Sequence, residues 1–564
     1  VALGVLTQAI TARTGITIDL PASLAALPVT VQHGPMPPRE ALPALLAAAG
    51  PARLTAELVY QLAADGTPVL QAVRVHQPDR GVAAASPSPS GAPAWWQELP
   101  SLPEARAGWR AWVRPTAYRG ISIDATALGA KLTLAPLEGT PAADQAPLVL
   151  TLPTPKGGTE RFALVESPLL APALAANYPE LRQYRGVGLD DPQATLRADF
   201  SPAGWHVQVL TPQGAWYLDP LWQGESTMHS VYRQQDLAAR GSTPCLVDDA
   251  AMTAAGLPPA VLASIRSSGD SRLRVFRLAM AANGEYTQFH GGTVANALAA
   301  ITTTVTRVTG IYERELNVRF SLVANNSAII YTDPASDPWS LNVPSASNLT
   351  KTQTAIDGAI GGGNYDVGHL LMTGNGGLAA LSSACNDRTK AQGATGTPQP
   401  FGDAFDVDFV CHELGHQLGA RHTFNGQGGA CGASRNPTTA YEPGSGSTIM
   451  GYAGICTGDD LQTHSDAYFH AISLDEIMAF LTNSASCATM TVGSNHNPVV
   501  DAGADLKIPV GTAFTLTGSA TDSDGDPLTL VWEEMDLGLK SSLGDPDDGT
   551  MPLFRSFLPT SSPS

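Results

Sequence analysis

The chain has 564 residues, of which 43% are hydrophobic and 15% charged, and its formal net charge is −19. This length corresponds to about four domains, and the apolar content excludes a wholly disordered chain. The acid excess argues against a nucleic-acid partner. The sequence has no uninterrupted run of about 18 apolar residues, so it predicts no membrane span.

Residues 1–78 predict a small α/β module. Leu3, Leu6 and Ile10 form a helical stripe, and the pattern continues in the order helix, strand, strand, helix, strand, strand. This order resembles the short N-terminal domain of secretins and TonB-dependent receptors, and a capping or docking module of no known role is the alternative. Residues 79–103, rich in Pro, Ser and Ala, predict a linker.

Residues 104–240 predict a β-rich block, because apolar runs alternate with Pro and Gly turns. The strand-like runs are 148–152, 161–165, 194–200, 205–210 and 216–218. Residues 241–270, which contain Cys245, predict a polar connector that a protease could cut.

Residues 271–490 predict the main domain, which mixes strands with helices. We expect strands at 273–281, 317–323, 328–331 and 367–372, a helix at 293–309 that ends at Gly310, a helix at 405–418 that ends at Gly419, and a last helix at 474–481 capped by Ser473.

Residues 497–564 predict the start of an immunoglobulin-like β-sandwich, with strand-like runs at 510–516 and 528–532. They resemble the PKD- or cadherin-like repeats of secreted bacterial enzymes, and 68 residues are few for a sandwich of roughly 100, so we expect a truncated domain. The acidic turn with Asp522, Asp524 and Asp526 predicts either a structural Ca²⁺ site or a solvated turn.

The chemistry lies in His412-Glu-Leu-Gly-His-Gln-Leu-Gly-Ala-Arg-His422. Residues four apart share one face of a helix, so His412 and His416 can bind one ion. A sharp turn at Gly419 would bring His422 round as the third ligand. Three imidazoles leave one zinc position open for water, as a catalytic site requires.

Glu413 adjoins the first histidine and can take a proton from that water and pass it to the leaving amine. The alternatives are buried histidines without a metal and a closed structural zinc site with a fourth protein ligand. Cys411 is the candidate for that ligand, but on a helix it lies about 100° from His412 and points away from the metal.

This motif, followed by Ser447-Thr-Ile-Met450-Gly-Tyr452, resembles the metzincin peptidases, and within them the bacterial reprolysin-like (adamalysin-like, M12B-type) zinc metallopeptidases. The resemblance implies a mixed twisted sheet above the cleft, two main helices and an irregular lower subdomain. It places Met450 beneath the zinc and makes the strand at 368–373 the cleft edge, which would bind an extended substrate by strand addition. Tyr452 has the spacing of an oxyanion-stabilising tyrosine, and a packed aromatic is the alternative.

The same resemblance implies disulfides between Cys431 and Cys456 and between Cys385 and Cys487, with Cys411 as a buried free thiol. It also makes the β-rich block a pro-region, because 150–155, 166–168 and 217–220 resemble that region of the bacterial group. Cys245 could then hold the enzyme latent by occupying the open zinc position; the alternatives are that it pairs with Cys411 or is idle.

We therefore expect a multidomain α+β protein that is a secreted zinc endopeptidase, monomeric, acting on protein or peptide substrates and made as a zymogen. Acidic charge and clustered cysteines favour an exported protein. The sequence begins at Val1 without a signal peptide, so we expect either that the N-terminus was removed or that this is a fragment. The alternatives are a catalytically vestigial adhesion or scaffold protein and a zinc hydrolase of a non-peptide bond.

Overall fold

The structure is a computed structural model that describes residues 17–19, 55–62, 68–76, 95–100, 110–238, 272–493, 495–547 and 549–562. The chain divides into two compact units, Val1–Ala92 and Pro93–Ser564. Most of the predicted linker and all of the predicted connector, with Cys245, lie outside the described residues; the described end of the linker, 95–100, contains a short strand, Trp96–Glu98. Within the described ranges, no helix has the length and apolar character needed to cross a membrane.

The first unit contains a three-stranded sheet. The central strand β3 (Pro68–His76) pairs parallel with β1 (Thr17–Asp19) and antiparallel with β2 (Thr55–Leu62). The three strands agree with the strands in the predicted order of elements. The two predicted helices of this unit lie outside the described residues.

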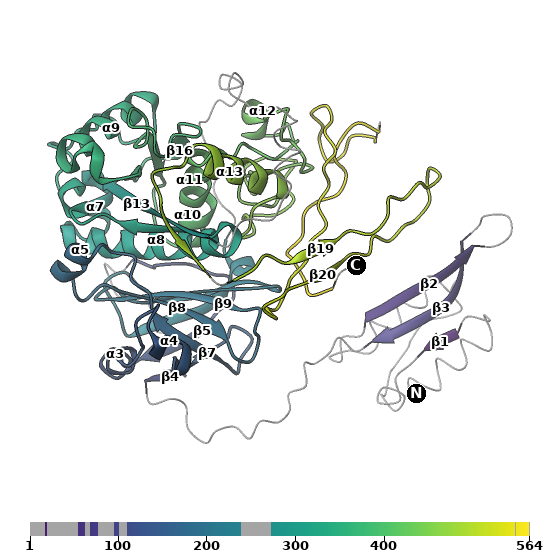
Figure 1. Cartoon of the computed structure of the whole chain (residues 1–564), viewed down its shortest axis with the longest axis horizontal. Coiled ribbons are helices and arrows are strands. Elements are labelled where there is room, and N and C mark those ends of the chain that lie inside the picture. The colour runs from purple at the N-terminus through teal and green to yellow at the C-terminus, as the bar shows by residue number, and fades with distance from the viewer. Residues whose placement is uncertain are drawn as a thin grey trace. The chain divides into compact units, whose positions relative to one another are not determined.

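The β-rich block is a nine-stranded antiparallel sheet at the start of the second unit (Figure 1). All five predicted strands are present, although the sequence patterns missed four others. In spatial order the strands are β4 (Trp96–Glu98), β5 (Arg119–Ile123), β12 (Met228–Arg233), β11 (Gly214–Pro220), β10 (Gly204–Thr211), β9 (Thr195–Ser201), β8 (Arg182–Gly188), β7 (Thr159–Glu166) and β6 (Leu148–Pro153).

The two faces of this sheet are both buried but differ in chemistry. Because side chains alternate along a strand, Trp205, Val207 and Val209 of β10 face an apolar core that includes helix α3 (Ala125–Leu132). Among the intervening positions, His206 and Gln208 are polar and equally buried. The short helices α4 (Pro141–Gln145) and α5 (Pro172–Asn177) complete the block.

The main domain is built on a six-stranded mixed sheet. Four strands run parallel in the order β14 (Val318–Leu322), β13 (Arg272–Ala282), β15 (Val367–Met372) and β17 (Gly393–Gly396); β16 (Gly376–Ala379) is an antiparallel edge strand, and β18 (Thr489–Val492) pairs with β13.

Helices cover both faces of this sheet. Helix α9 (Ala346–Ile360) packs on one face in a core with Leu370 and Met372. The other face carries α8 (Val294–Leu316) and the helical segment 403–417. The remaining helices are α7 (Gly284–Phe289), α12 (Cys431–Ser434) and α13 (Ala471–Asn483).

Helix α8 lies between the two sheets (Figure 1), and a buried ionic network joins the β-rich sheet, α8 and the helical segment 403–417. The Arg307 guanidinium of α8 donates to Asp219 of β11 at 2.6 Å and to Asp406 at 3.2 Å. Burial opposes the charge of Arg307, but the two carboxylates outweigh it and raise its pKa well above the usual value. The same pairing, together with His206, holds the pKa of Asp219 below its usual value despite burial.

A second contact of this interface reaches the helical segment 403–417 directly. The Tyr217 hydroxyl of β11 donates to the Asp403 carboxylate. Burial, with repulsion from Asp408, raises the pKa of Asp403 to about 7. The β-rich block therefore contributes side chains to the core and the polar contacts that fix this helix.

The structure corrects the predicted end of α8. Gly310 lies inside the helix, which continues to Leu316 and ends where Asn317 adopts a left-handed φ of 52°. A Cβ on Gly310 would lie 2.8 Å from Cγ of Arg197 and 3.0 Å from Oε1 of Gln208. The glycine is thus explained by the close approach of the β-rich sheet and not by a helix end.

Three other predictions in the main domain are wrong. The predicted strand at 328–331 lies largely in a 3₁₀ turn (Asn326–Ile329), and the last helix begins at Ala471 with His470 as its N-cap in place of Ser473. The strand at 367–372 is not the edge, because β15 lies between β13 and β17. The edge is β16, whose glycine-rich sequence gave no strand signal.

The predicted C-terminal β-sandwich is not confirmed. Among the described residues of 495–562, the only paired strands are β19 (Val499–Asp501) and β20 (Ser519–Thr521), and 510–516 form no strand. A lone two-stranded pairing buries little apolar surface, and Val510 and Phe514 are exposed. Other parts of the segment pack on the main domain; for example, the Tyr468 hydroxyl donates to the Phe557 carbonyl at 2.9 Å.

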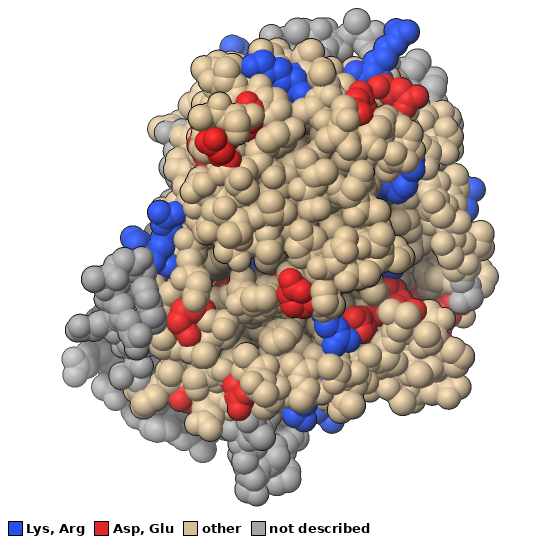
Figure 2. Space-filling model, turned by 90° about the vertical axis from the view of Figure 1, so that its left-hand side faces the viewer, with Lys and Arg blue, Asp and Glu red and all other residues tan. Residues whose placement is uncertain are grey.

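On the face drawn in Figure 2, Lys and Arg are scattered among acidic and uncharged residues and form no basic patch.

The carboxylates of Asp522, Asp524 and Asp526 each offer an oxygen within 4.8 Å of the others. Asp524 also accepts hydrogen bonds from His496. The predicted calcium role of this turn stays a prediction.

We predict opposite effects of one substitution at two helical glycines. Gly358→Ala in α9 adds a methyl group in open space and should stabilise the protein by about 0.5–1 kcal/mol. Gly310→Ala should destabilise it by about 1–3 kcal/mol, because the methyl group meets Arg197. Denaturant unfolding measures both, and stabilisation by Gly310→Ala would contradict the tight packing of sheet on helix.

Candidate active site

The site is carried by a continuous helical segment made of α10 (Asp403–Phe405), a π-helical stretch (Asp406–Cys411) and α11 (His412–Gln417). Phe405, Leu414 and Leu418 of this segment are buried in the core. The π-turn, a feature common at functional sites, ends at the residue before His412. At Gly419 the chain leaves the helix with φ of 106°, a conformation that favours glycine.

The turn brings His422 back beside His412 and His416, as the sequence predicts. The three Nε2 atoms lie 3.1–3.2 Å from one another, and all three side chains are buried. No other described residues of 110–493 form a comparable group of three His, Cys, Asp or Glu ligand atoms.

The opposite ring nitrogens explain the orientation of the three rings. Each Nδ1 lies 2.7 Å from a backbone carbonyl oxygen, that of Ile449 for His412, Ala420 for His416 and Ser434 for His422. A carbonyl only accepts, so each Nδ1 carries the hydrogen and each Nε2 presents a lone pair to the common point. Three converging lone pairs repel unless a cation lies between them, and zinc binds imidazole nitrogen at about 2.0–2.1 Å. The donor set therefore fits a zinc ion with an open position.

Glu413 is fully buried and faces the edge strand β16. A Cβ on Gly377 would lie 1.9 Å from its Oε1, so only glycine at this position leaves room for the carboxylate. The general-base candidate and the strand that would receive a substrate are thus in direct contact.

Met450 packs against the site helix at Gly415, and its predicted place beneath the zinc stays a prediction. A Cβ on Gly415 would lie 2.6 Å from the Met450 sulfur, and Met450 is fully buried. The preceding residue, Ile449, supplies the carbonyl that orients His412, so the Met450 turn both supports the helix and fixes a ring.

Tyr452 is buried with its ring between the histidines and Phe424. Its centroid lies 4.6 Å from that of His422, 5.7 Å from that of His412 and 4.3 Å from that of Phe424. This packing matches the packed-aromatic alternative; the oxyanion role stays a prediction.

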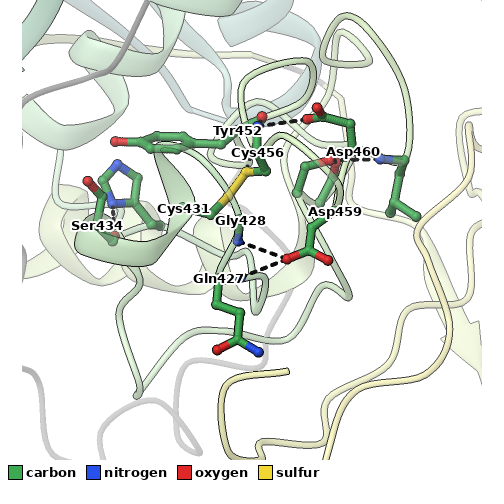
Figure 3. The surroundings of a disulfide bond; sticks show 12 residues. Gln427, Gly428, Cys431, Ser434, Tyr452, Cys456, Asp459 and Asp460 are labelled. Carbon is green, nitrogen blue, oxygen red and sulfur yellow. Dashed lines mark hydrogen bonds between the residues drawn. A yellow bond between two sulfur atoms is a disulfide. The ribbon is translucent and has the colours of Figure 1, made fainter. Parts of the chain in front are cut away.

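Both predicted disulfides are present, Cys431–Cys456 and Cys385–Cys487. Figure 3 shows the first beside Tyr452, with Ser434 on the neighbouring turn. This disulfide anchors α12, whose Ser434 carbonyl holds His422, to the segment that follows the Met450 turn. The Asp459 carboxylate reinforces the contact by accepting from the amides of Gln427 and Gly428 (Figure 3).

Cys411 is a buried free thiol, as expected. Burial raises its pKa well above the usual value, so the thiolate needed for metal binding is disfavoured. This agrees with a site that has three histidine ligands.

Residues 272–478 match the sequence model of a family described as metallo-peptidase family M12B, reprolysin-like. No curated protein matches the chain. Metalloproteinase-II from Bacteroides fragilis, a solved structure, is similar over 62% of this chain and 97% of its own, at 11% identity and a TM-score of 0.33.

The matched segment is a reprolysin-like metallopeptidase domain. The protein is therefore an enzyme, a zinc metalloendopeptidase.

We predict that Gly377→Ala strongly reduces kcat, at least 100-fold, because the new methyl group displaces the Glu413 carboxylate and small misplacements of catalytic groups cost about 10²-fold. Zinc content, measured by atomic absorption, should be unchanged. Gly363→Ala, which adds a methyl group in open space, is the matched control. Wild-type turnover in Gly377→Ala would contradict the role of Glu413 in the reaction.

We also predict different effects of removing the two disulfides. Replacing Cys431 and Cys456 by Ser should weaken zinc binding about 10-fold or more, because the support of His422 loosens. Replacing Cys385 and Cys487 should lower stability by about 2–4 kcal/mol and leave zinc affinity unchanged. Competition with a chelating indicator measures the affinity, and equal losses in both variants would count against a specific role of Cys431–Cys456.

Proposed function

We propose that the protein is a secreted endopeptidase that hydrolyses protein substrates at a zinc ion held by His412, His416 and His422. The observation that carries this proposal is the convergence of three buried Nε2 atoms whose Nδ1 atoms are held by carbonyls. When bound, zinc would polarise the scissile carbonyl and lower the pKa of a water towards about 7.

Glu413 is the general base and acid in this proposal. Its carboxylate adjoins His412 in sequence and is excluded from bulk water, so it can take a proton from the attacking water and deliver it to the leaving amine. Tyr452, in contact with two of the histidines, is the proposed oxyanion-stabilising residue. Replacing it with Phe would keep the packing and remove only the hydroxyl.

The edge strand β16 supports a peptide substrate. It pairs on one side with β17 and ends the sheet on the other, so its outer backbone groups can pair with an extended chain. This strand lies against Glu413, which brings a peptide bound along it to the proposed base.

Latency and secretion complete the proposal. The β-rich block packs on α8 and the site helix as a pro-region would, and the two disulfides favour an oxidising compartment. The Cys245 switch stays a prediction, because that residue lies outside the described ranges.

Intact mass followed over time in the presence of zinc tests the proposal. Wild-type chain should break between about 235 and 272, whereas Glu413→Ala should stay whole because it lacks the base. If the wild type also stays whole, Cys245→Ala should release the activity of a latent enzyme. A chain that stays whole in all three forms and cleaves no added protein would refute the peptidase.

A further inference from the structure

Glu442 is a buried carboxylate between α12 and the Met450 turn that the proposed reaction does not use. Its Oε2 accepts from the hydroxyls of Thr423 at 2.5 Å and Thr448 at 2.6 Å. Its Oε1 accepts from the amides of Ser447 at 2.8 Å and Thr448 at 3.2 Å. One carboxylate thus bridges two segments that are more than twenty residues apart in sequence.

Each bridged segment holds a histidine ligand. Thr423 directly follows His422, so the first contact fixes the backbone that leaves the third ligand. Thr448 directly precedes Ile449, whose carbonyl orients His412. The carboxylate therefore ties together the supports of two rings that must converge.

The backbone of the same residue repeats the connection. The Glu442 amide donates to the Thr423 carbonyl at 2.8 Å, and the Asn425 amide donates to the Glu442 carbonyl at 2.8 Å. The Thr423 amide in turn donates to the Met450 carbonyl at 3.2 Å. The side chain is closely confined, since a Cβ on Gly446 would lie 2.9 Å from Oε2.

On the basis of the zinc centre proposed above, we infer that Glu442 is a positioning residue that sets zinc affinity by clamping the segment that follows His422 to the Met450 turn. Buried carboxylates are costly unless they are hydrogen-bonded, and this one has donors on both oxygens. Partners that orient metal ligands typically account for 10–100-fold in metal affinity.

This role depends on the length of the Glu442 side chain and not on its charge. Glu442→Gln keeps the length of the side chain, its carbonyl oxygen can accept from the two amides, and its NH₂ group can donate to the threonine hydroxyls, which also accept. Glu442→Asp keeps the charge but is one methylene shorter, so it cannot span both segments. If Glu442 acts as a clamp, Glu442→Gln should preserve zinc affinity better than Glu442→Asp. If its role is purely electrostatic, Glu442→Asp should preserve zinc affinity better.

The experiment measures the zinc dissociation constant of the metal-free full chain by competition with a chelating indicator, and the denaturant unfolding of the same samples. Glu442→Asp and Glu442→Ala should weaken zinc binding 10–100-fold and shift the visible absorption of the cobalt-substituted protein. Glu442→Gln should stay within about threefold of wild type. Asp366→Ala, which removes a buried carboxylate paired with Arg277 elsewhere in the domain, should destabilise the fold without changing zinc affinity.

Wild-type affinity in Glu442→Asp, or a loss in Glu442→Gln as large as in Glu442→Asp, would overturn the clamp. An equal loss of zinc in Asp366→Ala would show general destabilisation and also overturn it. If Glu442→Ala does not fold, the comparison of Asp with Gln decides. A wild-type chain that binds no zinc would instead refute the proposed function, so the two failures are distinguishable.

Discussion

Three hydrogen bonds from ring nitrogens to backbone carbonyls are the constraint on which this structure depends. Each carbonyl fixes the tautomer and the direction of one imidazole, so three Nε2 lone pairs meet inside a buried site. The three carbonyls come from three different places: the end of the helix, the turn at α12 and the Met450 turn. The surrounding fold can be understood as the means of holding those three segments in register.

The supports of the site differ in physical kind. A disulfide anchors α12, a buried methionine fills the space that Gly415 leaves below the helix, and a carboxylate bridges the two remaining segments. The glycines act in the opposite sense, because Gly377, Gly415 and Gly419 provide room or backbone freedom where a side chain would displace a functional group. Rigid supports at some positions and the lack of a side chain at others together define the geometry of the site.

The local parts of this arrangement could be predicted from the sequence. Helical periodicity placed His412 and His416 on one face, and Gly419 indicated the turn that returns His422. Alternating apolar runs identified five strands of the β-rich block, because alternation is a property of each strand by itself. The two disulfides followed from the family resemblance, not from spacing.

Features set by tertiary contact could not be predicted in this way. The short strands β16 and β17 are rich in glycine and alanine and exist because β15 and one another supply their hydrogen bonds. Gly310 carries the same local signal as a helix end, and only the proximity of Arg197 explains it. The roles of Arg307 and Glu442 arise from partners more than eighty and nearly twenty residues away, respectively, so no local pattern marks them.

If the protein is made as the zymogen proposed above, the ionic network around Arg307 has a consequence for the timing of its activation. Cutting the connector between β12 and β13 removes a tether, but it breaks none of the contacts between β11, α8 and the site helix. The two pieces would remain a complex, whose lifetime would be set by a dissociation rate and whose reassociation would depend on concentration. Separation would also require Asp219 and Arg307 to regain water, because each would lose the other as a buried partner, whereas Arg307 and Asp406 would stay on the same piece. For the zymogen proposed above, cleavage and full release would therefore be two events with a delay between them, and dilution after export would favour full release by preventing rebinding.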